Sequence, residues 1–120
     1  MLSRDKRLRR ERDITRVYSK GRYGGGTNLQ VKTLVTGLSS SRAAIVVSKK
    51  VSKKAVVRNR IKRRIAALMA QDWQTVRPGC DIVVSVKVDT SNLTPDALAS
   101  ELTAALRKSG ALIETKGHNV

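Results

Sequence analysis

The basic residues of this chain are concentrated in its first half, where acidic residues are almost absent. Residues 1–64 hold 20 lysines and arginines against 3 aspartates and glutamates, whereas residues 65–120 hold 5 against 6. No acidic residue lies between Ile14 and Gln71, so these cations have no local partners for ion pairs. Whatever fold the chain adopts must display one sign of charge over much of its surface, and such a surface needs an external polyanion.

Two polyanions suit a chain with a formal net charge of +16, a nucleic acid and an anionic membrane. Membrane binding would require an apolar stretch of about 18 residues, or an amphipathic helix with Trp, Phe or Leu opposite its basic face. The sequence shows neither pattern, and no signal-peptide core follows the basic residues 1–12. We therefore expect a cytoplasmic nucleic-acid-binding protein with no membrane partner.

A length of 120 residues suits a single domain, residues 1–120, with one modest core. Aromatic residues make up 2% of the chain and phenylalanine is absent, so the core must consist of Val, Ile, Leu and Ala. Cys80 is the only cysteine, which excludes an internal disulfide and a cysteine-rich zinc site. We interpret residues 1–12 as a flexible basic arm and residues 111–120 as a loose tail.

Hydrophobic periodicity and turn residues predict six elements in the order α-β-β-α-β-α. They are a short helix with Asp13 as N-cap and Gly21 as stop, a hairpin of strands 29–36 and 42–48, a long helix from Ala55 to about Trp73, a strand over 81–88, and a last helix from Thr94-Pro95 to Gly110. Residues 22–28, with three consecutive glycines, are predicted to form a flexible loop. No strand precedes these glycines and no Gly-Lys-Ser/Thr follows them, so they do not match a phosphate-binding loop.

This order predicts an α+β protein, a small two-layer α/β sandwich whose helices cover one face of a short sheet. The second strand, the long helix and the third strand could form a crossover unit. For parallel strands the general rule favours a right-handed connection.

The long helix combines an apolar stripe with a cationic surface. The stripe consists of Val57, Ile61, Ile65, Leu68 and Met69. The opposite side and its flanks carry Arg58, Asn59, Arg60, Lys62 and Arg63, and the preceding turn carries Lys49, Lys50, Lys53 and Lys54. Ordinary solvated helices mix charges of both signs, whereas this one does not. Arginine can grip a phosphate through two hydrogen bonds, so the segment predicts nucleic-acid binding.

Two sequence stretches carry a family resemblance: Val47-Ser48-Lys49-Lys50-Val51 and Ala55-Val56-Val57-Arg58-Asn59-Arg60-Ile61-Lys62-Arg63. Together they closely resemble the signature of the bacterial ribonuclease P protein subunit, and the order of elements matches that family over nearly the whole chain. The resemblance implies a left-handed β-α-β crossover in place of the right-handed one. It also implies a ribonucleoprotein subunit that binds the catalytic RNA and the 5′ leader of precursor tRNA and assists endonucleolytic removal of the leader, with no obligate protein partner.

The resemblance assigns candidate residues to each RNA. Contacts to the catalytic RNA would come from Arg58, Asn59, Arg60, Lys62, Arg63, Lys49, Lys50, Lys53 and Lys54, with Arg64 supplying a charge that the family often carries at the position of Ala66. The cleft for the leader would involve Ile14, Arg16, Val17, Tyr18 and Lys32. Because the family often has aromatic residues where Ile14, Tyr18 and Lys32 stand, we expect leader binding to depend more on charge and less on stacking. The alternative is that Ile14, Val17 and Tyr18 form a core stripe.

The same residues bear on catalysis. Hydrolysis by a protein alone would need a general base such as histidine, or clustered carboxylates that hold Mg²⁺. The only histidine is His118, and the nine acidic residues are scattered. We therefore expect no catalytic and no metal-binding side chains, with Mg²⁺ held mainly by the RNA partner, which performs the chemistry.

Two other functions remain open from the sequence. A ribosomal or other structural RNA-binding protein would share the charge and size, but would not need the Arg-Asn-Arg spacing. A DNA-binding helix-turn-helix protein would place a helix before the recognition helix, whereas here a strand and a lysine-rich turn precede it.

Overall fold

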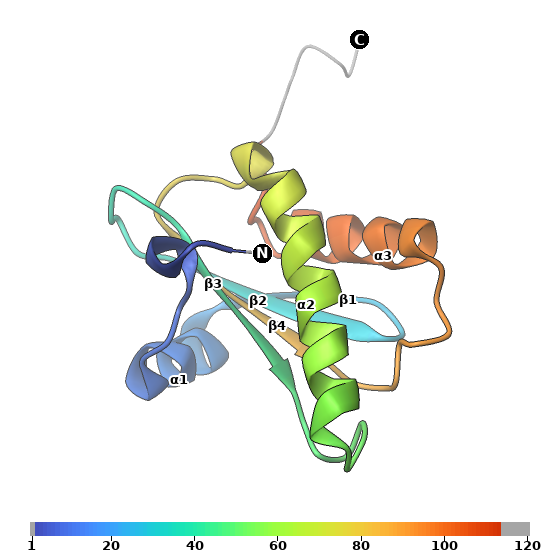
Figure 1. Ribbon diagram of the computed structural model, residues 1–120. Helices are drawn as coiled ribbons and strands as arrows, with labels where there is room; N and C mark the ends of the chain where they lie inside the picture. The colour runs from blue at the N-terminus through green and yellow to red at the C-terminus, as the bar shows by residue number, and fades with distance from the viewer. Residues whose placement is uncertain (1, 114–120) are drawn as a thin grey trace, which may run out of the picture.

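The computed structural model describes residues 2–113 (Figure 1). Its elements are η1 (Arg4–Lys6), α1 (Glu11–Lys20), β1 (Arg22–Gly25), β2 (Leu29–Val35), β3 (Arg42–Val47), α2 (Ala55–Gln71), η2 (Trp73–Thr75), β4 (Cys80–Val86) and α3 (Pro95–Lys108). Three α-helices and one mixed sheet confirm the predicted α+β class. Most of the predicted tail and His118 lie outside the described residues, but Ala111 is buried and Leu112 forms a β-bridge with Val76.

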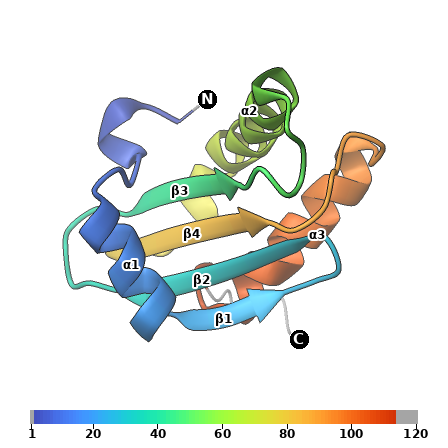
Figure 2. The same cartoon turned by 90° about the horizontal axis from the view of Figure 1, so that it is seen from below.

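The sheet has the strand order β1-β2-β4-β3 (Figure 2). β1 and β2 are antiparallel, as are β2 and β4, whereas β3 and β4 are parallel. The predicted hairpin between the strands now labelled β2 and β3 is therefore wrong, because β4 lies between them. β4 is buried along its whole length, and an apolar run of this kind is most stable as a central strand covered on both faces.

The connection from β3 through α2 to β4 is a left-handed crossover, as the family resemblance implied. In Figure 2 both strands run in the same direction, β3 lies above β4, and α2 passes behind the sheet while α1 lies in front. This departs from the usual handedness of parallel connections.

Helices pack on both faces of the sheet, which corrects the expectation that they cover one face only. α2 and α3 pack against the face that carries Leu29, Ile82 and Val84. α1 packs against the opposite face, where Val17 and Val83 form a smaller cluster. The predicted N-cap of α1 is also wrong, because the helix begins at Glu11 and Asp13 lies inside its first turn. α3 begins at Thr94-Pro95 as predicted; Thr94 is its N-cap, and the Thr94 hydroxyl accepts a hydrogen bond from the Ala97 N–H at 3.1 Å.

Residues 22–25 form the edge strand β1 instead of the predicted loop. Gly24 is buried beneath α3, and a Cβ atom at this position would lie 2.6 Å from the Ser109 nitrogen and also overlap the Ala105 oxygen. The missing side chain thus allows the backbones of β1 and α3 to approach each other closely. The sequence suggested flexibility at a position where glycine serves packing.

Residues 2–10, which we call the N-terminal strap, pack against the body of the protein, unlike the flexible arm that we expected. Leu2 belongs to the core cluster on the α2 side of the sheet, and Leu8 belongs to the cluster on the α1 side. The Leu8 N–H donates to the Ala43 carbonyl at 2.8 Å. The strap therefore crosses the outer edge of β3 and joins the two cores.

Replacement of Gly24 by alanine should destabilise the fold, because the new Cβ meets backbone atoms of α3 that cannot move independently. We expect Gly24→Ala to lower the free energy of unfolding by about 1 to 3 kcal/mol, measured by urea denaturation. Ser39→Ala, in the exposed loop after β2, serves as the control and should change it by less than about 0.5 kcal/mol. Equal stability of the two variants would mean that β1 and α3 are not in close contact.

Candidate nucleic-acid interface

The apolar stripe of α2 determines which side of the helix faces solvent. Ile61, Ile65 and Met69 are buried against the sheet, so the side opposite them must face solvent. The exposed side carries Asn59, Arg60, Lys62 and Arg63. The structure thus places these four side chains where the apolar stripe predicted them.

Among the described residues, the cations of α2 have no carboxylate partners. Within residues 2–113 only two ion pairs occur, and both use Arg42 of β3. The described part of the chain therefore offers the basic residues of α2 and of the preceding turn no acidic residue at ion-pair distance. Binding of a polyanion to such a surface is favourable, because the counterions condensed on the polyanion are released.

The N-terminus of α2 adds to the positive electrostatic potential of these cations. Lys54 occupies the N-cap position without a capping side-chain hydrogen bond, and the first turn contains no acidic residue. Lys49, Lys50 and Lys53 are exposed in the turn before it. Free N–H groups and the positive end of the helix dipole favour an anion at this position.

Two arginines of α2 differ from the exposed set because they bind the protein itself. Arg58 donates from Nη1 to the Ser52 carbonyl at 2.8 Å. Arg64 donates to the carbonyls of Thr90 and Leu93 at 3.1 and 2.8 Å, respectively. Arg58 therefore braces the turn before α2, and Arg64 braces the loop between β4 and α3. Part of the hydrogen-bonding capacity predicted for RNA is used for the fold.

Arg42 is likewise occupied within the protein. Its Nε and Nη2 donate to the two carboxylate oxygens of Asp81 at 2.9 and 2.7 Å, and its Nη1 lies 3.7 Å from Asp13 Oδ2 on α1. The hydrogen bonds with Asp81 raise the pKa of Arg42, in spite of its partial desolvation. This group ties α1 to the sheet.

The candidate leader residues on and beside α1 do not form one exposed set. Val17 is completely buried in the cluster with Leu8 and Val83, so for Val17 the core alternative is correct. Ile14 is half-buried against the same cluster, whereas Arg16 is exposed. Of these three residues, the structure therefore leaves Arg16 and the exposed part of Ile14 for contact with a ligand.

Tyr18 of α1 and Lys32 of β2 are in contact. Tyr18 is 38% exposed, and its hydroxyl forms a 2.8 Å hydrogen bond with the Ser85 hydroxyl of β4. Lys32 donates from Nζ to the Tyr18 carbonyl at 2.6 Å. The first bond holds the tyrosine ring over the central strand β4, and the second ties the C-terminal part of α1 to β2.

Sequence analysis missed Tyr23, because the residue lay in the presumed loop. Strand pairing places Tyr23 opposite Lys32, which in turn faces Val83, so the three side chains share the sheet face that carries α1. Tyr23 is 53% exposed. An aromatic ring thus lies next to Lys32, the position where the resemblance led us to expect one. Only the register of β1 reveals this, since residues 22–28 show no strand periodicity.

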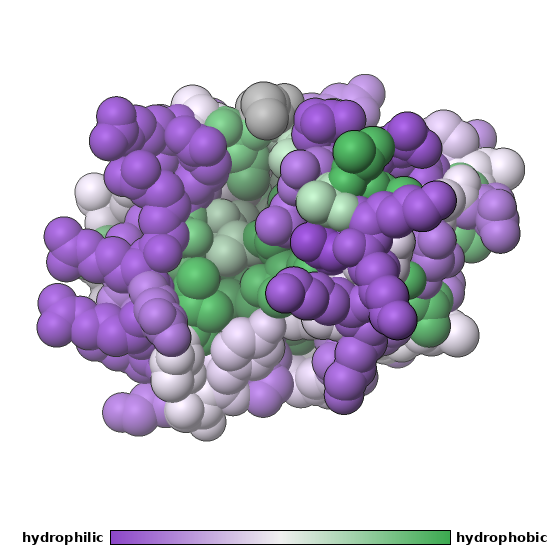
Figure 3. Space-filling view, turned by 60° about the horizontal axis from the view of Figure 1, so that its bottom comes forward, coloured by the Kyte–Doolittle hydropathy of each residue, from purple (hydrophilic) through white to green (hydrophobic). Residues whose placement is uncertain are grey.

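A trough separates α1 from α2 on the surface. Figure 3 shows a hollow with an apolar floor between two hydrophilic flanks, with η1 and α1 on the left, α2 on the right and β3 between them. β3 carries partly buried apolar side chains on both sides of the sheet, Ala44 and Val46 toward α1 and Ile45 toward α2. The arrangement suits a ligand that combines charged and apolar groups, as single-stranded RNA does.

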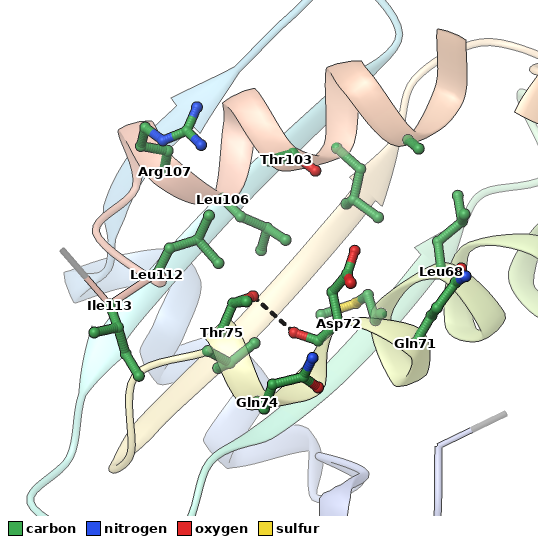
Figure 4. Close-up of a pocket in the computed structure, with 14 residues that line it drawn as sticks. Leu68, Gln71, Asp72, Gln74, Thr75, Thr103, Leu106, Arg107, Leu112 and Ile113 are labelled. Atoms are coloured by element: carbon green, nitrogen blue, oxygen red, sulfur yellow. Dashed lines mark hydrogen bonds between the residues drawn. The ribbon is translucent and has the colours of Figure 1, made fainter. Parts of the chain in front are cut away.

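A second hollow lies away from these residues. It has a volume of about 690 Å³ between the end of α2, η2 and α3, and Leu68, Leu102, Leu106 and Leu112 form much of its wall (Figure 4). None of the predicted RNA-binding residues lines it. Within residues 2–113 no three His, Cys, Asp or Glu side chains are grouped to hold a metal ion, and no helix there is long and apolar enough to cross a membrane.

Comparison with known proteins connects this geometry to one family. The family model described as Ribonuclease P matches residues 2–110. The ribonuclease P protein component of Pseudanabaena sp. (strain PCC 6903) is 41% identical over 113 residues, which cover 93% of this chain and 97% of the relative. The RNase P protein of Staphylococcus aureus has a TM-score of 0.80 at 26% identity and covers 90% of this chain and 98% of its own. The Thermotoga maritima protein has a TM-score of 0.76 at 27% identity, with coverage of 91% and 98%.

The neighbouring arginines Arg63 and Arg64 should differ in their effect on stability. Arg64→Ala removes charged donors from two carbonyls and should lower the free energy of unfolding by about 1 to 3 kcal/mol. Arg63→Ala, the matched control on the exposed side, should change it by less than about 0.5 kcal/mol. Urea denaturation of both variants measures the difference, and a destabilisation by Arg63→Ala as large as that by Arg64→Ala would contradict the assignment.

Proposed function

This chain belongs to the ribonuclease P protein family, and on that premise we propose that it binds the catalytic RNA of ribonuclease P and the 5′ leader of precursor tRNA, and thereby assists endonucleolytic removal of the leader. The observation that carries the proposal is the exposed cation set of α2, which has no carboxylate partner in the described residues. We also propose that the protein acts in the cytoplasm with its RNA partners and needs no further protein.

The two RNAs would occupy different parts of the surface. The exposed side and N-terminus of α2 suit the phosphates of a folded RNA, because several cations lie there on one rigid helix. The trough suits the single-stranded leader, since its floor is apolar. Beyond it, Tyr18 on α1 and Tyr23 on the opposite edge strand β1 have exposed rings on the sheet face that carries α1, where further bases of the leader could stack. Tyr23 would in this way compensate for the aromatic residue that the family often has where Lys32 stands.

The contribution of the protein to catalysis would be electrostatic. Catalytic RNA and precursor tRNA are both polyanions, and the cations of α2 would reduce the repulsion between them. Mg²⁺, held mainly by the RNA, would supply Lewis-acid chemistry at the scissile phosphate. The side chains described here would position the leader and carry no proton-transfer step.

Reconstitution with a bacterial ribonuclease P RNA tests the proposal. At low Mg²⁺ the protein should increase the rate of precursor-tRNA cleavage, while protein freed of RNA should cleave nothing. With about six to ten phosphate contacts, affinity for the RNA should fall roughly 10³- to 10⁵-fold between low and moderate salt. Absence of stimulation would favour a structural RNA-binding role, and cleavage by RNA-free protein would refute catalysis by the RNA.

Within that assay, the double replacement of Arg60 and Arg63 by glutamine should weaken binding of the catalytic RNA roughly 10-fold or more, because two phosphate contacts are lost. The control replaces Arg107 and Lys108 on α3 by glutamine. This removes the same charge from another part of the surface and should change the affinity for the catalytic RNA little. Equal losses for the two variants would show that net charge alone determines affinity.

Tyr23 should contribute to affinity for the leader. If a base stacks on its ring, Tyr23→Ala should weaken precursor-tRNA binding by about 1 to 3 kcal/mol, whereas Tyr23→Phe should retain most of the affinity. Mature tRNA, which lacks the leader, should bind both variants and the wild type alike. A loss of affinity for mature tRNA would place Tyr23 outside the leader site.

A further inference from the structure

The N-terminal strap carries cations that the proposed function has not used. Its nine residues include Arg4, Lys6, Arg7, Arg9 and Arg10, against Asp5 alone. The Asp5 carboxylate accepts a hydrogen bond from the Ser3 hydroxyl at 2.7 Å. No carboxylate of the described residues lies within ion-pair distance of any of the five cations. They are therefore as uncompensated as the cations of α2.

The backbone of the strap is fixed in position by contacts along its length. Leu2 and Leu8 are 7% and 3% exposed in the two cores, the Leu8 N–H is bonded to β3, and the Lys6 ammonium lies 5.7 Å from the centre of the Trp73 ring. Because this order exists before any ligand binds, the ligand need not supply the entropy cost of arranging the strap. The side chains of Arg4, Arg7, Arg9 and Arg10 are exposed on its outer side.

The strap and α2 lie on opposite sides of the trough. In Figure 3 the left flank, formed by η1 and α1, faces the right flank, formed by α2, across the apolar floor of β3. The two leucines of the strap point into the protein, so the strap offers no apolar side chain for insertion into a membrane. The exposed groups of the strap are guanidinium groups, which suit the binding of phosphates.

We infer that the N-terminal strap is a second RNA-binding surface, which holds a phosphodiester backbone through Arg4, Arg7, Arg9 and Arg10 independently of α2. The inference rests on the proposed function and extends it, because RNA would be held from both sides of the trough. The phosphodiester can belong to the catalytic RNA or to the leader of precursor tRNA. Both sources present the same chemistry, and they differ in the assay that detects them.

The experiment uses the full chain with the double replacement Arg9→Gln and Arg10→Gln, neither of which has an ion pair or a side-chain hydrogen bond in the structure. Replacement of Arg107 and Lys108 by glutamine removes the same charge elsewhere and is the control. Affinity for a bacterial ribonuclease P RNA is measured over a range of salt concentrations without substrate. The assembled complexes are then titrated with mature tRNA and with precursor tRNAs that have short and long leaders. Urea denaturation verifies that each variant is folded.

If the catalytic RNA is the ligand, the strap variant should lose roughly 10-fold in affinity for it, and the slope of log affinity against log salt should fall by about 2. If the leader is the ligand, that affinity is unchanged and the loss for precursor tRNA grows with leader length. Combined with Arg60→Gln and Arg63→Gln, the losses should be additive, since the two surfaces are separate.

Either pattern supports the inference. A strap variant that matches the Arg107 and Lys108 control in every titration, while the wild type binds RNA, would overturn the inference and leave the proposed function intact. A wild-type protein that binds neither RNA would overturn the proposed function and the inference together.

Discussion

The burial of the apolar stripe of α2 against the sheet is the interaction on which the rest of the structure depends. Full burial of side chains such as Ile61, Ile65 and Met69 contributes about 1.5 to 3 kcal/mol each. Repulsion between like charges one helical turn apart costs only about 0.2 to 0.5 kcal/mol per pair. The free energy gained by burying the apolar stripe therefore exceeds the cost of the repulsion. The helix can keep Arg60, Lys62 and Arg63 together on its outer side without unwinding.

Three carboxylates of the described residues bind groups of the fold and do not pair with the cations of α2. Asp13 and Asp81 hold Arg42 between α1 and the sheet. Glu101 of α3 accepts hydrogen bonds from the Asn28 side chain and from the N–H groups of Asn28 and Leu29, at 2.7 to 2.8 Å. Burial raises the pKa of Glu101, but the three bonds together lower it below its ordinary value. These carboxylates fix the turn before β2 and the contact of α1 with the sheet.

The trough links these local arrangements to the proposed binding of RNA. The left-handed connection through α2 places the cationic helix beside β3, the outer strand of the sheet. The strap crosses the edge of the same strand from the other side. A single apolar strand thus separates two basic surfaces, and an RNA that lies along it can place bases on the floor and phosphates on either flank. This geometry requires both the strand order and the packing of the strap.

The sequence alone determined the exposed and buried sides of α2, the charge that requires a polyanion and, through the Arg-Asn-Arg signature, the family and the handedness of its crossover. Only the tertiary structure placed β4 between β2 and β3, ordered the strap, buried Val17 and brought Tyr23 beside Lys32. The physical reason is that periodicity records which side of a segment avoids water, a local property, but not which distant segment covers it. Strand order and helix docking depend on contacts between residues far apart in the chain. Gly24 shows the same limit, since a missing side chain suggests freedom in the sequence and permits close packing in the fold.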